Sequence, residues 1–110
     1  MDARPRQMPT FDRRTVDERA TVVVIEGELD IGSADALRSA LDAAAAEGTA
    51  VVRLEAAGVH FLDSSALGVI LAAGQRLAER GSRLELANAT PAVRRILEMT
   101  LITRTVHVIP

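Results

Sequence analysis

The sequence contains no cysteine, so disulfide bonds, thiolate metal sites and cysteine nucleophiles are all excluded. Aromatic residues make up only 2% of the chain, which means that the core has to be built from aliphatic side chains and alanine. Stacking on aromatic rings, the usual way to hold single-stranded nucleic acid, therefore lacks the side chains it needs. The net charge of -2 gives no field that would attract a polyanion. These features argue against nucleic acid as a partner.

Long apolar runs are also missing. No run approaches the ~20 residues that a helix needs to cross a bilayer. The N-terminal stretch MDARPRQMPTF lacks the apolar core of a secretory signal. We therefore expect a cytoplasmic protein without direct membrane contact. The chain of 110 residues has room for one compact domain, and we predict a flexible tail over residues 1–10 followed by a single domain over residues 11–110.

Apolar runs and turn-forming residues divide the chain into alternating strands and helices. The first helix is expected to begin at Ser33 and to stop at Gly48, and the second ends at Gly81. The third opens at Thr90-Pro91, where a capping hydroxyl precedes a proline at the first helical position. The expected strands are 11–16, 21–26, 51–55, 83–87 and, as a candidate at the C-terminal end, 105–109.

The resulting order is β-β-α-β-α-β-α, with a candidate final strand. Strands that alternate with helices are joined by right-handed crossovers, so most of them lie parallel. The run 21–26 is β-branched and nearly continuous, which is typical of a central strand covered on both faces. We predict an α/β fold with a mixed, mostly parallel sheet of four to five strands and three main helices. Apolar residues spaced three and four apart give each helix one face that we expect to be buried: Leu37, Ala40, Leu41 and Ala44; Leu67, Ile70, Leu71, Gly74 and Leu77; and Val93, Ile96 and Leu97.

The stretch FLDSSALG, at positions 61–68, places an aspartate and two serines between an apolar strand and an apolar helix. One interpretation is structural: Asp63 caps the helix, Ser64 and Ser65 fill its first turn, and all three side chains satisfy free backbone N–H groups. The other is functional, because the partial positive charge and free N–H groups of a helix N-terminus tolerate a phosphate on a first-turn serine. Such a phosphate, beside Asp63, would oppose any protein interface laid over this helix end.

The usual signatures of an active site are absent. His60 and His107 lack the spacing of metal ligands. A serine hydrolase presents its nucleophile on a Gly-x-Ser-x-Gly elbow, whereas the two serines here follow Leu62-Asp63 and precede Ala66. No Gly-Lys-Ser phosphate-binding sequence occurs. We therefore expect no enzymatic activity, and a hydrolase with Ser64 as its nucleophile serves only as a contrast.

A second acidic stretch, Gly27-Glu28-Leu29-Asp30, follows the strand 21–26. These carboxylates can be interpreted as solvated charges in a connection. Because parallel neighbouring strands end at the same edge of a sheet, however, we expect this stretch to lie beside the start of the Ser64 helix. Ligand and partner sites on open α/β sheets favour that edge. Residues 88–90, which follow the fourth strand, belong to the same rim.

In these stretches the chain resembles a known family. GELD after the second strand, FLDSSALGVIL and finally ATPAVRRILEMT are similar, at these spacings, to the anti-anti-sigma factors, which are single-domain STAS proteins of bacteria. The resemblance covers residues 11–108. Its most specific element is Asp-Ser-Ser followed by Leu-Gly at the start of the second helix. It implies a STAS-type fold with the element order given above.

The resemblance implies a switch that works by partner exchange. In that family the unphosphorylated protein binds an anti-sigma factor, itself a serine kinase of the histidine-kinase-like ATPase fold, and thereby frees a sigma factor. The kinase uses Mg-ATP to phosphorylate the serine after the motif aspartate, here Ser64, with Ser65 as the second candidate. A metal-dependent serine phosphatase removes the phosphate. ATP and metal belong to those partners, so the resemblance implies no cofactor for this chain.

The resemblance also implies where the partner binds. Asp63 helps to present Ser64, and Asp30 and its loop border the contact surface. The full set of implied partner-binding residues is Glu28, Asp30, Asp63, Ser64, Ser65 and Gly68. The alternative function is a STAS module that does not switch, either a constitutive scaffold or a soluble subunit of a membrane transport complex.

Two positions depart from the family pattern. Ala66 stands where glycine commonly follows the two serines, and since alanine favours a helical backbone by about 1 kcal/mol over glycine, we expect a stiffer site. After the third helix the family usually has Thr-Gly-Leu, whereas this chain has Thr100-Leu101-Ile102. Leucine tolerates a left-handed cap poorly, so we expect the third helix to end differently or to continue.

Overall fold

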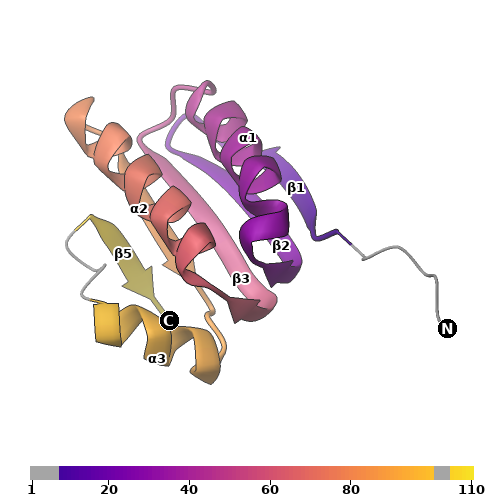
Figure 1. Cartoon of the computed structure of the whole chain (residues 1–110). Coiled ribbons are helices and arrows are strands. Elements are labelled where there is room, and N and C mark those ends of the chain that lie inside the picture. The colour runs from indigo at the N-terminus through magenta and orange to yellow at the C-terminus, as the bar shows by residue number, and fades with distance from the viewer. Residues whose placement is uncertain (1–7, 101–104) are drawn as a thin grey trace, which may run out of the picture.

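The computed structural model describes residues 8–100 and 105–110, and its strands and helices alternate along the chain as predicted (Figure 1). A short 3-10 turn, η1, precedes the first helix. The strands are β1 (Thr10–Thr15), β2 (Ala20–Leu29), β3 (Val51–Leu62), β4 (Arg83–Ala87) and β5 (Val106–Ile109). The helical elements are η1 (Ile31–Ser33), α1 (Ala34–Ala45), α2 (Ser64–Glu79) and α3 (Pro91–Thr100). The order β-β-α-β-α-β-α-β is therefore confirmed, including the terminal strand.

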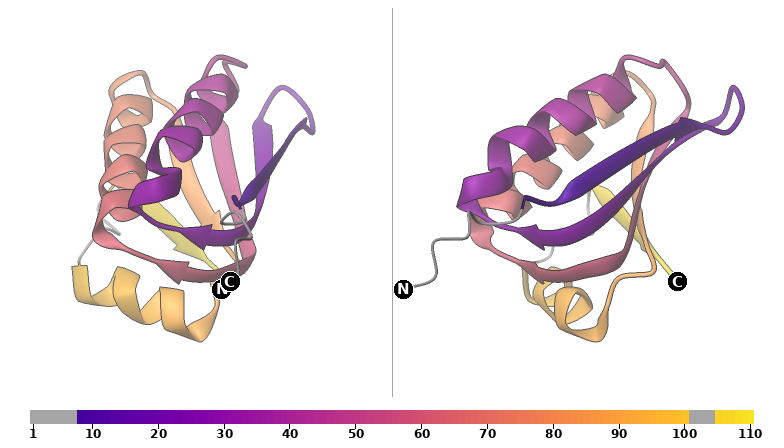
Figure 2. Two further views of the ribbon diagram at one scale, coloured as in Figure 1. Left: turned by 45° about the vertical axis from the view of Figure 1, so that its right-hand side comes forward. Right: turned by 90° about the vertical axis from the view of Figure 1, so that its right-hand side faces the viewer.

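The five strands form one mixed sheet in the order β1-β2-β3-β4-β5. β1 pairs antiparallel with β2, and the other three pairs are parallel. α1 and α2 lie side by side on one face of the sheet, while α3 lies near the carboxyl end of β3 (Figure 2). The Thr90 hydroxyl at the start of α3 donates to the Val59 carbonyl of β3 at 3.3 Å.

The core between the sheet and the helices is aliphatic, as the composition predicts. All the buried hydrophobic side chains among the described residues are valine, isoleucine, leucine or alanine. Phe11 is only partly buried and packs against this core. The largest fully buried members include Ile25, Leu29, Leu37, Leu54, Ile70, Leu84, Leu86 and Leu97. All three predicted helices thus contribute to one core.

The prediction that the second strand is covered on both faces was wrong. β2 is an interior strand, between β1 and β3. However, Val23 and Ile25 are buried while Val22 and Val24, which point to the other face, are only half-buried. β-Branched side chains favour the pleated backbone on either face of a sheet, so an unbroken valine run does not require cover on both sides.

β2 and β3 both extend beyond their predicted ends. β3 continues to Leu62, so His60 lies within the strand and not in the connection to α2. The extension depends on two glycines. Gly27 has a φ of +121°, and a Cβ on Gly58 would lie 2.9 Å from Glu26 Cγ, so the pairing of the two strands shifts register here without steric conflict.

The helices agree with their predicted buried faces at most positions. Leu71 is an exception, because it is 36% exposed, and the buried stripe of α2 passes through Val69 and Ala73 instead. Ala40, Leu67 and Ile96 are half-buried. The predicted change at the end of the third helix concerns residues 101 and 102, and most of the predicted tail is residues 1–7; both lie outside the described residues.

Candidate functional site

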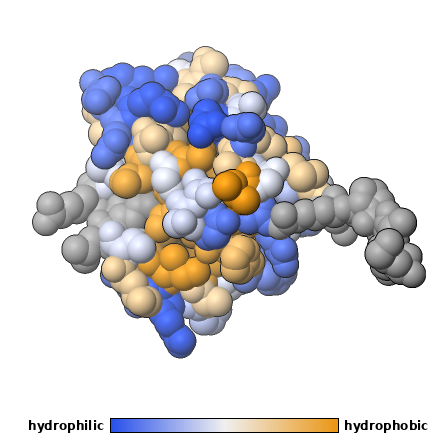
Figure 3. Space-filling model, viewed as in Figure 1, coloured by the Kyte–Doolittle hydropathy of each residue, from blue (hydrophilic) through white to orange (hydrophobic). Residues whose placement is uncertain are grey.

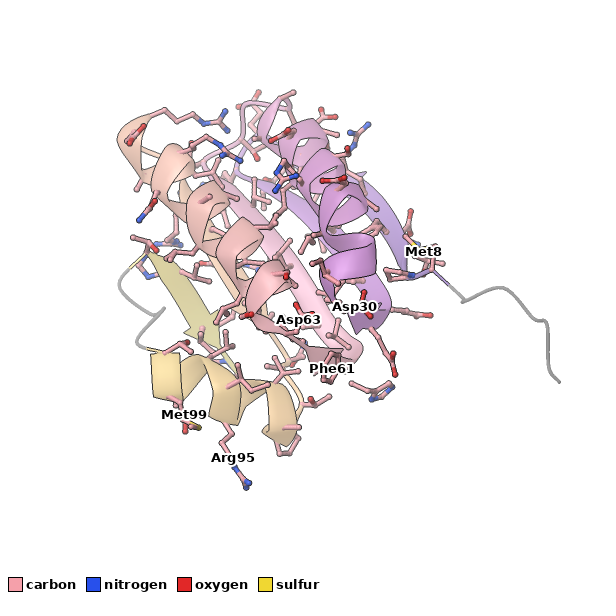
Figure 4. The ribbon with its side chains drawn as sticks, in the orientation of Figure 1. Met8, Asp30, Phe61, Asp63, Arg95 and Met99 are labelled. Carbon is pink, nitrogen blue, oxygen red and sulfur yellow. The ribbon has the colours of Figure 1, made fainter. Side chains whose placement is uncertain are left out.

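The connections after β2 and β3 meet at one edge of the sheet, as the parallel arrangement predicts. The Asp63 N–H donates to the Leu29 carbonyl at 3.0 Å, and the Ile31 N–H donates to Asp63 Oδ2, also at 3.0 Å. Figure 4 shows Asp30 and Asp63 close to each other, near the first turns of α1 and α2. The two acidic stretches therefore form one surface, which we call the acidic edge and define by residues 28–33 and 61–68.

Asp63 is the N-cap of α2. Its backbone is extended, with φ -103° and ψ -179°, and its Oδ1 accepts the Ala66 N–H at 3.1 Å. Its carbonyl accepts the Leu67 N–H at 3.0 Å, which begins the helix. One carboxylate thus caps α2 with one oxygen and holds the neighbouring connection with the other. The structural interpretation of Asp63 is confirmed.

The two serines do not take part in this capping. Ser64, the first residue of α2, is exposed, and Ser65 is half-buried. Neither hydroxyl hydrogen-bonds to any residue that the structure describes. The expectation that the serine hydroxyls also satisfy N–H groups of the first turn was therefore wrong, because Asp63 alone supplies the side-chain cap. The Ser64 hydroxyl is left accessible on the surface.

Asp30 is held in place more firmly than a solvated charge would be. It is only 6% exposed, and its N–H donates to Ser33 Oγ at 3.0 Å. The Ser33 hydroxyl also lies 3.3 Å from the Glu28 carbonyl and 3.2 Å from the Asp30 carbonyl. The interpretation of Asp30 as a solvated charge was wrong, whereas Glu28 is exposed. Asp30 and Ser33 fix the shape of the connection between β2 and α1.

Two apolar residues at the acidic edge were missed by the sequence analysis. Ile31 is 76% exposed and Phe61 is 47% exposed. Phe61 lies opposite Glu28 in the register of β2 and β3, and the Ile31 N–H is bonded to Asp63. Figure 3 shows hydrophobic surface gathered near the first turns of α1 and α2 and above α3. The signal for Phe61 was present, because it alternates with the inward-facing Leu62 at the end of a strand.

Gly68 lies on the exposed side of α2, one turn after the cap. A Cβ added to it would meet no other atom within 4 Å. Since glycine in a helix interior costs about 1 kcal/mol relative to alanine, the fold gains nothing from it. Thr90, from the rim predicted for residues 88–90, caps α3: its hydroxyl accepts the Val93 N–H at 3.3 Å.

A comparison with protein families identifies this architecture. The model of the STAS domain matches residues 13–110. The chain belongs to the STAS domain family. The STAS domain of this chain is also similar to two proteins named anti-sigma F factor antagonist. That of Paenibacillus polymyxa is 31% identical over 80 residues, which cover 72% of this chain and 68% of that protein. That of Lysinibacillus sphaericus is 28% identical over 91 residues, which cover 82% and 78%.

A solved structure agrees with these relatives. The crystal structure of an anti-sigma factor antagonist from Mycobacterium paratuberculosis superposes on this STAS domain with a TM-score of 0.82 and 26% identity, over 93% of this chain and 86% of that one. The resemblance to anti-anti-sigma factors is thus confirmed. In the described part of the chain, no helix is long and apolar enough to cross a membrane, and no cluster of three or more His, Asp or Glu side chains is arranged to hold a metal ion.

Proposed function

We propose that this STAS domain is an anti-sigma factor antagonist that is switched by phosphorylation. Its unphosphorylated form binds an anti-sigma factor that is a serine kinase and thereby releases a sigma factor. Phosphorylation of Ser64 ends this binding, and a serine phosphatase restores it. The named relatives support the role of antagonist. The observation that carries the switch is that Asp63 alone caps α2, which leaves the Ser64 hydroxyl exposed and without a structural task.

The position of Ser64 makes a phosphate compatible with the fold. As the first residue of α2, Ser64 stands where the helix dipole favours negative charge. Its hydroxyl holds no other described residue, so its modification breaks no hydrogen bond of the domain. The phosphate adds between about 1.5 and 2 negative charges next to the Asp63 carboxylate. The modification therefore changes the surface while the domain stays folded.

The same charge is unfavourable for a bound partner. The acidic edge already carries the carboxylates of Glu28, Asp30 and Asp63, so basic or hydrogen-bond-donating groups complement it. A phosphate in the middle of the contact would have to be desolvated and would repel any acid opposite it. A loss of about 3 kcal/mol weakens binding by about two orders of magnitude.

We place the partner contact on Glu28, Asp63, Ser64, Ser65 and Gly68. Ile31 and Phe61 extend it, because exposed apolar side chains surrounded by polar groups are typical of the centre of an interface. Asp30, which is buried, acts by holding the connection with Ser33. Gly68 lets the partner backbone approach α2 closely, which accounts for a glycine that the fold does not need.

This function requires no catalysis by the chain itself. A hydrolytic serine needs a general base, such as histidine or lysine, within hydrogen-bond distance, and no described residue is bonded to the Ser64 hydroxyl. In this proposal the kinase binds Mg-ATP, and the phosphatase binds the metal that it needs to remove the phosphate. The anti-sigma factor exchanges the sigma factor for this STAS domain in the cytoplasm. A scaffold or transport subunit that does not switch would share the fold, and only modification of Ser64 separates the two functions.

The test is to incubate the protein with candidate anti-sigma factor kinases and Mg-ATP and to map phosphate by mass spectrometry. Ser65→Ala is the matched control for Ser64→Ala, since it changes the neighbouring hydroxyl. We expect one phosphate on wild type and on Ser65→Ala, and none on Ser64→Ala. Phosphate on none of the three proteins, or on Ser64→Ala as much as on wild type, would exclude a switch at Ser64 and favour the scaffold.

A further inference from the structure

A hollow lined by arginines lies at the opposite edge of the sheet from Ser64, where β3 and β4 begin. It has a volume of about 460 Å³ and is lined by Arg19, Ala20, Ala50, Val51, Arg53, Gly81 and Arg83. Val52 and Leu54 point into the core beneath the helices, so their neighbours Val51 and Arg53 point to the other face of the sheet. The hollow therefore opens on the face that α1 and α2 leave uncovered.

The strand register explains its shape. Ala20, Val51 and Arg83 lie in one row across β2, β3 and β4. Ala20 and Val51 therefore form the floor of the hollow with small side chains, and Arg83 stands at one end of the row. Gly81, which has a φ of +80°, adds no side chain to the rim. Arg53 and Glu85 face each other in the row two residues further along the strands.

A buried carboxylate positions two of the three arginines. The Glu85 side chain is 7% exposed, and its Oε1 accepts from Arg53 Nε at 3.0 Å. Its Oε2 lies 2.8 Å from a terminal nitrogen of Arg83. A guanidinium has five N–H donors, so each arginine keeps donors that Glu85 does not use. Glu85 thus holds both groups in place beside the hollow and leaves part of each available.

The positive charge is only partly compensated. Arg19, at the end of the turn between β1 and β2, forms no side-chain hydrogen bond or ion pair with another described residue. The nearby carboxylates are Glu85 and Asp17, whose Oδ1 accepts the N–H groups of Arg19 and Ala20 at 2.7 and 3.1 Å. Three guanidinium groups against these two carboxylates leave one positive charge, and no carboxylate of the described residues lines the hollow. Arginine is well suited to phosphate groups, because its planar guanidinium binds phosphate oxygens through paired N–H donors.

We propose that this hollow binds a small oxyanion with two adjacent anionic groups, of the pyrophosphate class. Arg53 and Arg83 hold the first anionic group with their remaining N–H donors, and Arg19 closes on the second. The site lies apart from the acidic edge, so it does not depend on the function proposed for Ser64. A ligand there and a partner at the acidic edge occupy different ends of the same sheet.

The test is calorimetry with sodium pyrophosphate, at an ionic strength kept constant with sodium chloride, together with amide chemical shifts from NMR. We expect saturable binding of one pyrophosphate, with shifts concentrated in residues 19–20, 50–53 and 81–85. Orthophosphate, which offers a single anionic group, is expected to bind at least tenfold more weakly. Equal binding of the two anions, or no saturation, would show only screening of surface charge and would overturn the proposal.

Variants test the residues directly. Arg19→Gln removes a side chain that holds no other described residue, so it leaves the fold intact and is expected to weaken pyrophosphate binding at least tenfold. Arg38→Gln is the matched control, because Arg38 is an exposed arginine that pairs with Asp35 on α1. Arg38→Gln and Ser64→Ala are expected to bind within twofold of wild type. If Arg19→Gln bound as tightly as Arg38→Gln, the assignment would be wrong.

Discussion

The Asp63 carboxylate accepts the Ile31 N–H at 3.0 Å and so joins two connections that are separated by a helix and a strand. Its other oxygen accepts the Ala66 N–H at 3.1 Å. The exposed Ile31 side chain and the exposed Ser64 are therefore held in a fixed relation by the residue between them. A partner that contacts both surfaces meets a preorganised site, which lowers the entropy lost on binding.

Replacing this carboxylate should reduce the stability of the domain. We predict that Asp63→Ala lowers the free energy of unfolding by about 1–2 kcal/mol, because it removes the cap of α2 and the acceptor for the Ile31 N–H. Urea denaturation measures this loss. Asp35→Ala is the control, since Asp35 is exposed and pairs with no described residue other than Arg38, and we expect it to cost about 0.5 kcal/mol or less. Equal losses in the two variants would contradict the role of Asp63.

Two glycines of α2 should respond in opposite directions to alanine. A Cβ at Gly74 would lie 2.6 Å from the Thr105 carbonyl oxygen, whereas a Cβ at Gly68 would meet nothing within 4 Å. We predict that Gly74→Ala lowers the free energy of unfolding by about 1–3 kcal/mol through overpacking. Gly68→Ala should raise it by up to about 1 kcal/mol through helix propensity. Thermal and urea unfolding of the pair measure both signs, and a stable Gly74→Ala would refute the packing of α2 against the start of β5.

Gly68→Ala also separates stability from binding. If the partner backbone approaches α2 closely at Gly68, the added methyl weakens binding to the anti-sigma factor at least tenfold while the domain becomes more stable. Surface plasmon resonance with the partner immobilised measures this loss. Ala78→Ser, an exposed change near the other end of α2, serves as the control and should leave the affinity unchanged. Unchanged affinity of Gly68→Ala would remove Gly68 from the contact.

Ala66 departs from the family pattern, and the structure gives it a role in the core. Its side chain is fully buried beneath the first turn of α2. We predict that Ala66→Gly lowers the free energy of unfolding by about 1–2 kcal/mol, from helix propensity and the lost methyl contacts. Phosphorylation of Ser64 should persist in this variant. Chemical denaturation measures the free energy of unfolding, and mass spectrometry measures the phosphate on Ser64. An Ala66→Gly variant that is as stable as wild type but is no longer phosphorylated would contradict both predictions.

The element order and the aliphatic core could be predicted because they follow from local patterns: alternation of strand and helix segments, spacing of leucines and valines, and a threonine-proline helix start. The ends of β2 and β3 could not. Glycine has a low propensity for strands, so Gly27 and Gly58 do not predict one. They belong to the sheet because Gly27 pairs with β3 and Gly58 pairs with β2, where the register of the two strands shifts. Such pairing joins residues about thirty positions apart and leaves no local signature.

The candidate site was predictable to a similar degree. The acid and serines of FLDSSALG and the parallel topology were enough to place Asp63 beside the GELD stretch. The burial of Asp30 depends on Ser33 turning back to its N–H, and the exposure of Ile31 follows from that turn. The alternation in β4 likewise indicates that Glu85 points away from the helix-covered core. Its burial could not be predicted, because it depends on Arg53, which lies on another strand.

The central claim is that a phosphate on Ser64 prevents partner binding without unfolding the domain. The most direct measurement is the affinity of the unphosphorylated protein, of the Ser64-phosphorylated protein and of Ser64→Ala for the anti-sigma factor kinase, by calorimetry. We predict that Ser64→Ala binds within about threefold of the unphosphorylated protein, and that the phosphorylated protein, with an unchanged circular dichroism spectrum, binds at least about 100-fold more weakly. Equal affinity of the phosphorylated and unphosphorylated proteins would contradict the claim.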